Sequence, residues 1–231
     1  MLQTTRWSLV MAARGDGADA RAALEQLCST YRAPVLRFAR RHARDLPEAE
    51  DLTQAFFVQF LEHALHAAAD PTRGSFRSFL LTALRRFIGH VHEHDRAIKR
   101  GGGQRLQALD SGVISTLAED EDDSPEQEFE RACALAVLER ATLQLQAEAE
   151  RAGKSELFQR LRAFLFESPD ANAYRRIADD LGLRANTLSV TVHRLRERLR
   201  ALVRAELAQT VTSEAALNEE LRTLRKVLER H

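Results

Sequence analysis

The chain has 231 residues, a formal net charge of zero and 44% hydrophobic residues, enough for two small domains with separate cores. No apolar run approaches the length of a membrane span, and the first residues lack the basic-then-apolar order of a signal peptide. We therefore expect no membrane partner and a cytoplasmic location. Cys28 and Cys133 stand isolated in helical patterns, which favours free thiols in a reducing compartment over a disulfide.

Charged residues form blocks of alternating sign, although their sum is zero. Basic blocks cover residues 32–44, 96–105 and 184–204, and acidic blocks cover residues 45–51 and 119–130. Because a local cluster of one sign dominates the field around it, a neutral chain of this kind can still bind nucleic acid.

The periodicity of the first hundred residues predicts an all-α domain at residues 1–100. We place helices at about residues 5–14, 20–44, 47–66 and 75–98, and we expect them to form one bundle. No segment has the alternation typical of a strand.

The helix at about residues 47–66 has two different faces. Leu52, Phe56 and Phe60 recur every four residues and predict a buried stripe. Glu48 and Asp51 lie on another face, where carboxylates suit a basic partner.

The next helix combines an apolar stripe with arginines. The stripe comprises Phe76, Phe79, Leu80, Leu84 and Phe87, and the arginines are Arg77, Arg85 and Arg86. This mixture suits base stacking and phosphate binding, but the phenylalanines also fit a buried stripe. We therefore assign the phenylalanines mainly to packing and the arginines to DNA.

Two short motifs do not indicate an enzyme. His90 and His94 share a helix face, but His92 points away, and a histidine–aspartate hydrolase needs further ligands on separate helices. The glycines at 101–103 follow no strand and lack the Gly-Lys-Ser/Thr ending of a phosphate loop. We expect no catalytic residues, no bound metal and no cofactor.

Residues 101–124 are predicted to be a flexible linker, because they are rich in small and acidic residues. The acidic stretch at 119–123 either keeps the linker solvated, which we favour, or mimics nucleic acid. A second domain is expected at residues 125–208, followed by a C-terminal extension at residues 209–231.

The second domain is predicted to end in a helix-turn-helix, after a long and a short helix. Ile177 and Ala178 mark a short amphipathic helix, which Gly182 ends because glycine tolerates the left-handed conformation. The following helix has a buried stripe of Leu188, Val192, Leu195, Leu199 and Leu202 and an outward face of Thr187, Val190, Thr191, Arg194 and Arg198. Hydroxyl and guanidinium groups on that face suit a major groove.

The C-terminal extension carries leucines at helical spacing, namely Leu217, Leu221, Leu224 and Leu228. Two heptads are few for a dimerising zipper, so we favour a helix that packs on its own domain.

Residues 48–57, EAEDLTQAFF, resemble the signature of extracytoplasmic-function sigma factors, members of the sigma-70 family of bacterial RNA polymerase. In that family an N-terminal helical domain binds the polymerase clamp helices and melts the minus-ten element, and a C-terminal helix-turn-helix reads minus-thirty-five. The resemblance covers nearly the whole chain. Residues 4–10, 70–81, 99–103 and 192–198 resemble one branch that is often linked to serine/threonine protein kinases, which makes such a kinase a candidate partner.

The resemblance implies core RNA polymerase and promoter DNA as partners, with three binding surfaces. The candidates for polymerase binding are Glu48, Asp51 and Gln54. The candidates for the minus-ten element are Thr72, Arg73 and Ser75, in a loop that captures a flipped base in the family, together with Arg77, Arg85 and Arg86. The candidates for the minus-thirty-five element are Thr187, Ser189, Val190, Thr191, Arg194 and Arg198.

Ala55 departs from the family, which usually carries an acid there. A phosphate on Thr53, taken to lie at an exposed helix edge, would add about 1.5 to 2 negative charges to this depleted face. We hypothesise a phosphorylation switch at Thr53; the alternative is a plain helical threonine.

The helix-turn-helix also departs from the family. A capping serine or threonine is usual where this chain has Arg184, and a basic residue is usual near Ser189. Asn186 or Thr187 is therefore the candidate cap, and phosphate binding is expected to shift to Arg194, Arg196 and Arg198.

Two other classes remain open. A stand-alone helix-turn-helix regulator would bind duplex DNA by itself, usually as a dimer on a palindrome, whereas a sigma factor needs core polymerase. A sigma-like signalling adaptor would no longer initiate transcription, and Ala55 and Ser189 are its only support. Promoter melting excludes the adaptor.

Overall fold

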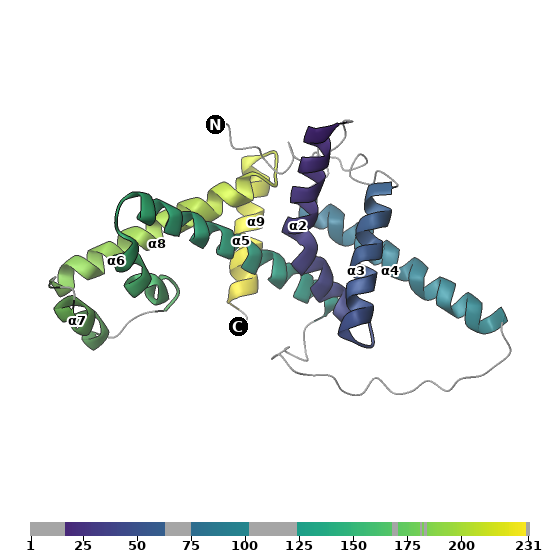
Figure 1. Cartoon of the computed structure of the whole chain (residues 1–231), viewed down its shortest axis with the longest axis horizontal. Coiled ribbons are helices and arrows are strands. Elements are labelled where there is room, and N and C mark those ends of the chain that lie inside the picture. Colours follow the sequence, from purple (N-terminus) through teal and green to yellow (C-terminus); the bar gives the residue numbers. More distant parts are fainter. Residues whose placement is uncertain are drawn as a thin grey trace. The chain divides into compact units, whose positions relative to one another are not determined.

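The structure is a computed structural model that describes residues 17–62, 75–101, 124–167, 171–180, 182 and 184–229. Every element in these ranges is helical, so the predicted all-α class is confirmed. The elements, labelled in Figure 1, are α2 (Ala18–Arg40), α3 (Leu46–Glu62), α4 (Phe76–Gly101), α5 (Pro125–Arg151), α6 (Ser155–Leu161), η3 (Arg162–Leu165), α7 (Ala171–Asp180), α8 (Ala185–Ala208) and α9 (Glu214–Leu228). The helix expected at about residues 5–14 lies outside the described residues.

The chain forms two compact units. The first combines Met1–Ala136 with Ala208–His231, and the second is Val137–Leu207. This division differs from the predicted one, which began the second domain at residue 125. The first turns of α5 belong to the first unit, because Phe129 and Cys133 are buried in its core. Most of the predicted linker lies outside the described residues.

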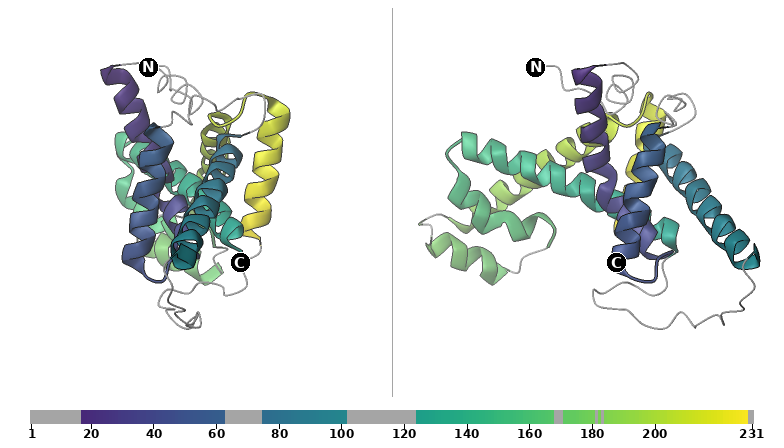
Figure 2. Two further views of the ribbon diagram at one scale, coloured as in Figure 1. Left: turned by 90° about the vertical axis from the view of Figure 1, so that its right-hand side faces the viewer. Right: turned by 45° about the vertical axis from the view of Figure 1, so that its right-hand side comes forward.

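The core of the first unit is built from α2, α3, α4 and the start of α5. The first three of these helices lie side by side in the views of Figures 1 and 2. Tyr31 of α2 contacts Phe76 of α4 with ring centroids 5.2 Å apart, and Phe56 of α3 contacts Phe87 of α4 at 5.6 Å. The assignment of Phe76 and Phe87 to packing is therefore confirmed, and neither ring is free to stack on a base.

The second unit contains most of α5, the short helices α6 and η3, and the pair α7 and α8. Leu161, Ala178, Leu188 and Val192 form one hydrophobic cluster that joins α6, α7 and α8. Gly182 lies between α7 and α8 with a φ of 61°, the left-handed conformation predicted for the residue that ends the shorter helix.

Helix α9 belongs to the first unit, together with α2, α3 and α4. Ser213 caps its start, since the amide of Ala216 donates to the Ser213 hydroxyl at 3.2 Å. Leu217 is buried, so the extension packs within the chain as we favoured, but in the first unit rather than beside the predicted second domain.

None of the helices in the described ranges is both long enough and apolar enough to cross a bilayer.

Candidate functional site

The outward face of α3 carries two of the three residues predicted to bind polymerase. Asp51 and Gln54 are exposed, and so are Ala55, Val58 and Glu62 at the following helical positions. Gln54 and Ala55 both lie three or four residues from Asp51 and from Val58, and Glu62 lies four residues beyond Val58. The five residues therefore form one continuous strip, which we call the α3 face. The α3 face contains charged, polar and apolar side chains, and the buried stripe of α3 lies on the opposite side of the helix.

The carboxylate of Glu48, the third predicted polymerase contact, accepts hydrogen bonds from the nearby Arg44. The backbone amide of Arg44 donates to its carboxylate at 2.6 Å, and the Arg44 side chain donates at 3.1 and 3.2 Å. These hydrogen bonds hold the pKa of Glu48 below its ordinary value. Asp45 in turn accepts from the Glu48 amide at 2.9 Å. Glu48 therefore helps to fix the turn between α2 and α3.

Thr53 is not at an exposed helix edge, and that prediction is wrong. Its side chain is 2% exposed, and its hydroxyl donates to the carbonyl oxygen of Ala49 at 2.7 Å. Thr53 faces inward because it continues the buried stripe of Ala49, Phe56 and Phe60 at spacings of four, three and four. A kinase can reach this hydroxyl only if α3 moves away from the core.

Ser75 begins α4 as its N-terminal cap. The amide of Ser78 donates to the Ser75 hydroxyl at 3.3 Å, and the two hydroxyl oxygens are 3.1 Å apart. Ser75 is buried, so it is placed to start the helix rather than to meet a base directly. Thr72 and Arg73, the other two candidates for base capture, lie outside the described residues.

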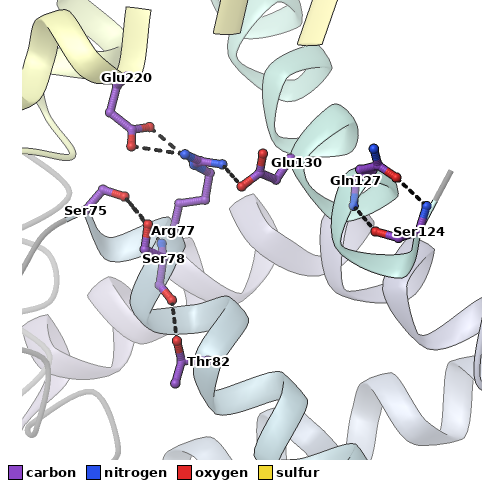
Figure 3. Close-up of polar contacts among 8 residues, drawn as sticks. All are labelled: Ser75, Arg77, Ser78, Thr82, Ser124, Gln127, Glu130 and Glu220. Atoms are coloured by element: carbon purple, nitrogen blue, oxygen red, sulfur yellow. Dashed lines mark hydrogen bonds and ion pairs between the residues drawn. The ribbon is translucent and has the colours of Figure 1, made fainter. Parts of the chain in front are cut away.

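Arg77 follows on the first turn of α4 and is largely buried. Its guanidinium group pairs with Glu130 of α5 at 2.8 Å and with Glu220 of α9 at 3.1 Å, as Figure 3 shows. Burial by itself lowers the pKa of the Arg77 guanidinium, but the carboxylates of Glu220 and Glu130 outweigh it and raise that pKa above its ordinary value.

The other two arginines predicted to bind minus-ten DNA are exposed. Arg85 donates to Glu126 at the start of α5 at 2.9 Å, and Arg86 lies beside it on α4. Burial tends to raise the pKa of Glu126, but hydrogen bonds from its own backbone, Ser124 and Arg85 lower it below its ordinary value. Arg85 and Arg86 are thus open to solvent, while Arg77 is enclosed.

The outward face of α8 carries the residues predicted to read minus-thirty-five DNA. Thr187, Ser189, Val190 and Arg194 are exposed, and Val190 is one of the more exposed large apolar side chains among the described residues. Thr191 is half-buried, and its hydroxyl donates to the carbonyl oxygen of Thr187 at 2.8 Å. Thr187, Val190, Thr191 and Arg194 thus lie on one side of α8, whereas Ser189 lies about 100° or more around the helix from each of them.

The predicted cap by Asn186 or Thr187 is wrong. Helix α8 already begins at Ala185, and the carbonyl oxygen of Arg184 accepts from the amides of Thr187 and Leu188 at 2.9 and 3.3 Å. Arg184 therefore precedes the helix, in the position where the family usually has a serine or threonine.

Two of the three arginines expected to bind phosphate are engaged within the second unit. Arg198 donates to both carboxylate oxygens of Glu148 at 2.8 and 2.6 Å. This pairing lowers the pKa of Glu148 and raises that of Arg198. Arg196 donates to the carbonyl oxygens of Phe164 at 2.8 Å and Glu167 at 2.5 Å, which fixes the end of η3. The local sequence pattern around Arg196 does not predict this structural role.

Residues 27–93 match the model of a protein family described as Sigma-70 region 2. The match begins in α2, includes all of α3 and ends within α4. No curated protein and no solved structure matches the chain. Residues 27–93 are therefore similar to Sigma-70 region 2, and this similarity supports a relation of the chain to the sigma-70 family of sigma factors.

Proposed function

We propose that the chain is a sigma factor of the extracytoplasmic-function type, which binds core RNA polymerase in the cytoplasm and directs initiation at a subset of promoters. The observation that carries the proposal is the Sigma-70 region 2 match over residues 27–93. Polymerase supplies the chemistry, so the chain itself needs no catalytic residues.

The α3 face is our proposed docking surface for polymerase. Its exposed side chains lie on the helix that carries the signature EAEDLTQAFF, and none of its five residues contributes to the hydrophobic core. Asp51 supplies the negative charge that a basic clamp helix would meet, and Val58 adds an apolar contact. Glu48 contributes more weakly, because Arg44 already occupies its carboxylate.

The pair α7 and α8 is our proposed helix-turn-helix for the minus-thirty-five element. Support comes from the short glycine turn at Gly182 and from the exposed hydroxyl, apolar and guanidinium groups along α8. Arg194 is the best placed of these arginines for a phosphate or a base edge, because it is exposed and Arg198 is paired with Glu148.

Transcription initiated from genomic DNA fragments tests the proposal. The fragments are incubated with core RNA polymerase of the source organism alone, with the chain alone, and with both, and the RNA starts are mapped. We expect a small set of reproducible start sites only when both are present. Sequence-specific binding to duplex DNA by the chain alone, with no new start sites, would instead identify a stand-alone regulator.

Phosphorylation of Thr53 by a serine/threonine kinase remains a prediction attached to this function. Because the Thr53 hydroxyl is buried, α3 must move away from the core before a phosphate can be added to it. Start-site mapping with a Thr53→Ala variant under the conditions that activate the wild type tests it, since full activity of that variant would exclude the switch.

A further inference from the structure

Arg77 stands at the junction of three helices of the first unit. It lies on the first turn of α4, and its partners Glu130 and Glu220 come from α5 and α9 (Figure 3). All three guanidinium nitrogens are engaged: Nη1 meets Glu130 at 2.8 Å, while Nε and Nη2 meet the two oxygens of Glu220 at 3.2 and 3.1 Å. Glu220 therefore forms a bidentate ion pair with Arg77.

The Arg77–Glu220 pair is enclosed rather than exposed on the surface. The side chain of Arg77 is 14% exposed and that of Glu220 is 12% exposed. A guanidinium group binds a carboxylate and a phosphodiester through the same fork of parallel N–H donors. Glu220 thus occupies the edge of Arg77 with which this arginine would bind the DNA backbone.

Helix α9 is attached to the first unit by few buried side chains. Of the residues Glu214–Leu228, Leu217 is buried and the others are half-buried or exposed. Leu228, at the end of the helix, is one of the exposed large apolar residues. With one fully buried side chain in α9, the ion pair of Glu220 is one of the contacts that hold this helix on the first unit.

We propose that α9 is an internal competitor of DNA, in which Glu220 occupies the Arg77 guanidinium of the free chain and a DNA phosphate takes its place when α9 is displaced. The proposal rests on the proposed function, because Arg77 lies within the matched region 2 domain. The DNA site of this domain is then partly closed in the free chain and opens on binding. By linkage, DNA weakens the attachment of α9 as much as α9 weakens the binding of DNA.

The test measures the binding of the full-length chain to a short fluorescent single-stranded DNA of mixed sequence, by anisotropy, over a range of salt concentrations. The releasing variant is Glu220→Gln, which keeps the shape of the side chain and removes its charge. The matched control is Glu219→Gln, which removes the same charge from the neighbouring position, where Glu219 is exposed and pairs with Arg222. Thermal melting checks that both variants are folded.

Glu220→Gln is expected to bind the DNA roughly tenfold more tightly than wild type, because one charge-assisted contact is gained. The slope of log K against log salt is expected to steepen by roughly 0.7, the value for one further phosphate contact on a single strand. Glu219→Gln should leave this slope unchanged. Adding Arg77→Gln to Glu220→Gln should abolish both gains, since the phosphate contact is lost.

A second measurement uses the wild-type chain alone. Amide hydrogen exchange in α9 is expected to accelerate when the same DNA is added at saturation, because the helix loses its partner on α4. Equal affinities and slopes for Glu220→Gln and Glu219→Gln, or unchanged protection of α9 at saturating DNA, would overturn the proposal and leave Arg77 as a structural residue.

The transcription experiment separates this inference from the proposed function. Start sites that require both polymerase and the chain, together with no effect of Glu220→Gln on DNA binding, would overturn only the role of α9. Absence of such start sites, together with tighter binding by Glu220→Gln, would refute the sigma-factor function and keep the competition between Glu220 and DNA.

Discussion

Two arginine–carboxylate pairs, one in each unit, differ in how far they are enclosed. In the first, Arg77 pairs with Glu220 inside the packing, and Glu128 is buried within 3.3 Å of Arg41. In the second, Arg198 pairs with Glu148 at the surface, where the arginine side chain is 51% exposed. Removing one partner of an enclosed ion pair is strongly destabilising, because the other charge is left buried without a partner. In an exposed pair, either side chain can exchange its partner for water or phosphate at little cost in free energy. DNA should therefore reach α8 freely and reach Arg77 only after a rearrangement.

The largest effect is expected from Arg77→Ala, which leaves two carboxylates facing each other without their cation. We expect the free energy of unfolding to fall by about 3 kcal/mol, the cost of removing one partner from a buried ion pair. Urea denaturation followed by circular dichroism measures it. Arg86→Ala, on the exposed side of the same helix, is the control and should change stability by less than about 0.5 kcal/mol. Equal losses for the two variants would remove the distinction between enclosed and exposed arginines.

Thr53 and Thr82 provide the same contrast within the first unit. Both hydroxyls donate to the carbonyl oxygen four residues earlier, at 2.7 and 2.9 Å, but Thr53 is buried and Thr82 is exposed. Thr53→Asp should lower the free energy of unfolding by about 2 kcal/mol, because it places a charge in the core. Thr82→Asp should stay within about 0.5 kcal/mol. A stable Thr53→Asp protein would contradict the buried placement of Thr53.

A pH effect is expected from His42, at the end of α2. Burial and the neighbouring His92 lower its pKa, Glu126 opposes this shift, and Arg41 adds to it. The folded chain then binds fewer protons than the unfolded chain, so the stability is present above the ordinary value of about 6.5 and is lost as pH falls below it.

Unfolding measured between neutral and mildly acidic pH checks this expectation. His42→Gln should reduce the loss of stability on acidification, whereas His90→Gln, at an exposed histidine of α4, should keep the wild-type dependence. Identical pH profiles for wild type and His42→Gln would count against a lowered pKa at the half-buried His42.

The smallest effect is expected from Arg198→Ala in the second unit. Its pair with Glu148 is half-exposed, so the free energy of unfolding should change by less than about 1 kcal/mol. Lowering the pH through the depressed folded pKa of Glu148 should remove even this contribution, because the carboxylate is then protonated. A loss as large as that of Arg77→Ala would mean that exposure does not distinguish the Arg198–Glu148 pair from the Arg77–Glu220 pair.

Local patterns in the sequence predicted much of the fold. The helices α2 to α4 lie within a few residues of their predicted ranges, and Gly182 separates α7 from α8 as expected. These features depend on neighbours along the chain, which helical periodicity and the backbone freedom of glycine report directly. The inward orientation of Thr53 could also have been predicted from the sequence, because Ala49, Phe56 and Phe60 lie four, three and seven residues away from it on the same helix face.

Ion pairs and core contacts between residues far apart in the chain could not be predicted from the sequence. Arg77 and Glu220 are 143 residues apart, and each alone resembles an ordinary charged residue on an amphipathic helix. The division of α5 between two units was hidden for the same reason, because Phe129 has no local mark that assigns it to the first core. Among the predicted site residues, exposure at Asp51 and Arg194 followed from periodicity, whereas the enclosure of Arg77 depends on α9.

The most direct test of the central claim is the affinity of the chain for core RNA polymerase at one fixed salt concentration. Asp51→Lys reverses the charge on the α3 face, and Glu25→Lys makes the same change at an exposed position of α2. We expect wild type to bind, Asp51→Lys to bind at least roughly tenfold more weakly, and Glu25→Lys to stay within roughly a factor of two. No binding by wild type, or equal affinities for the two variants, would contradict docking through the α3 face.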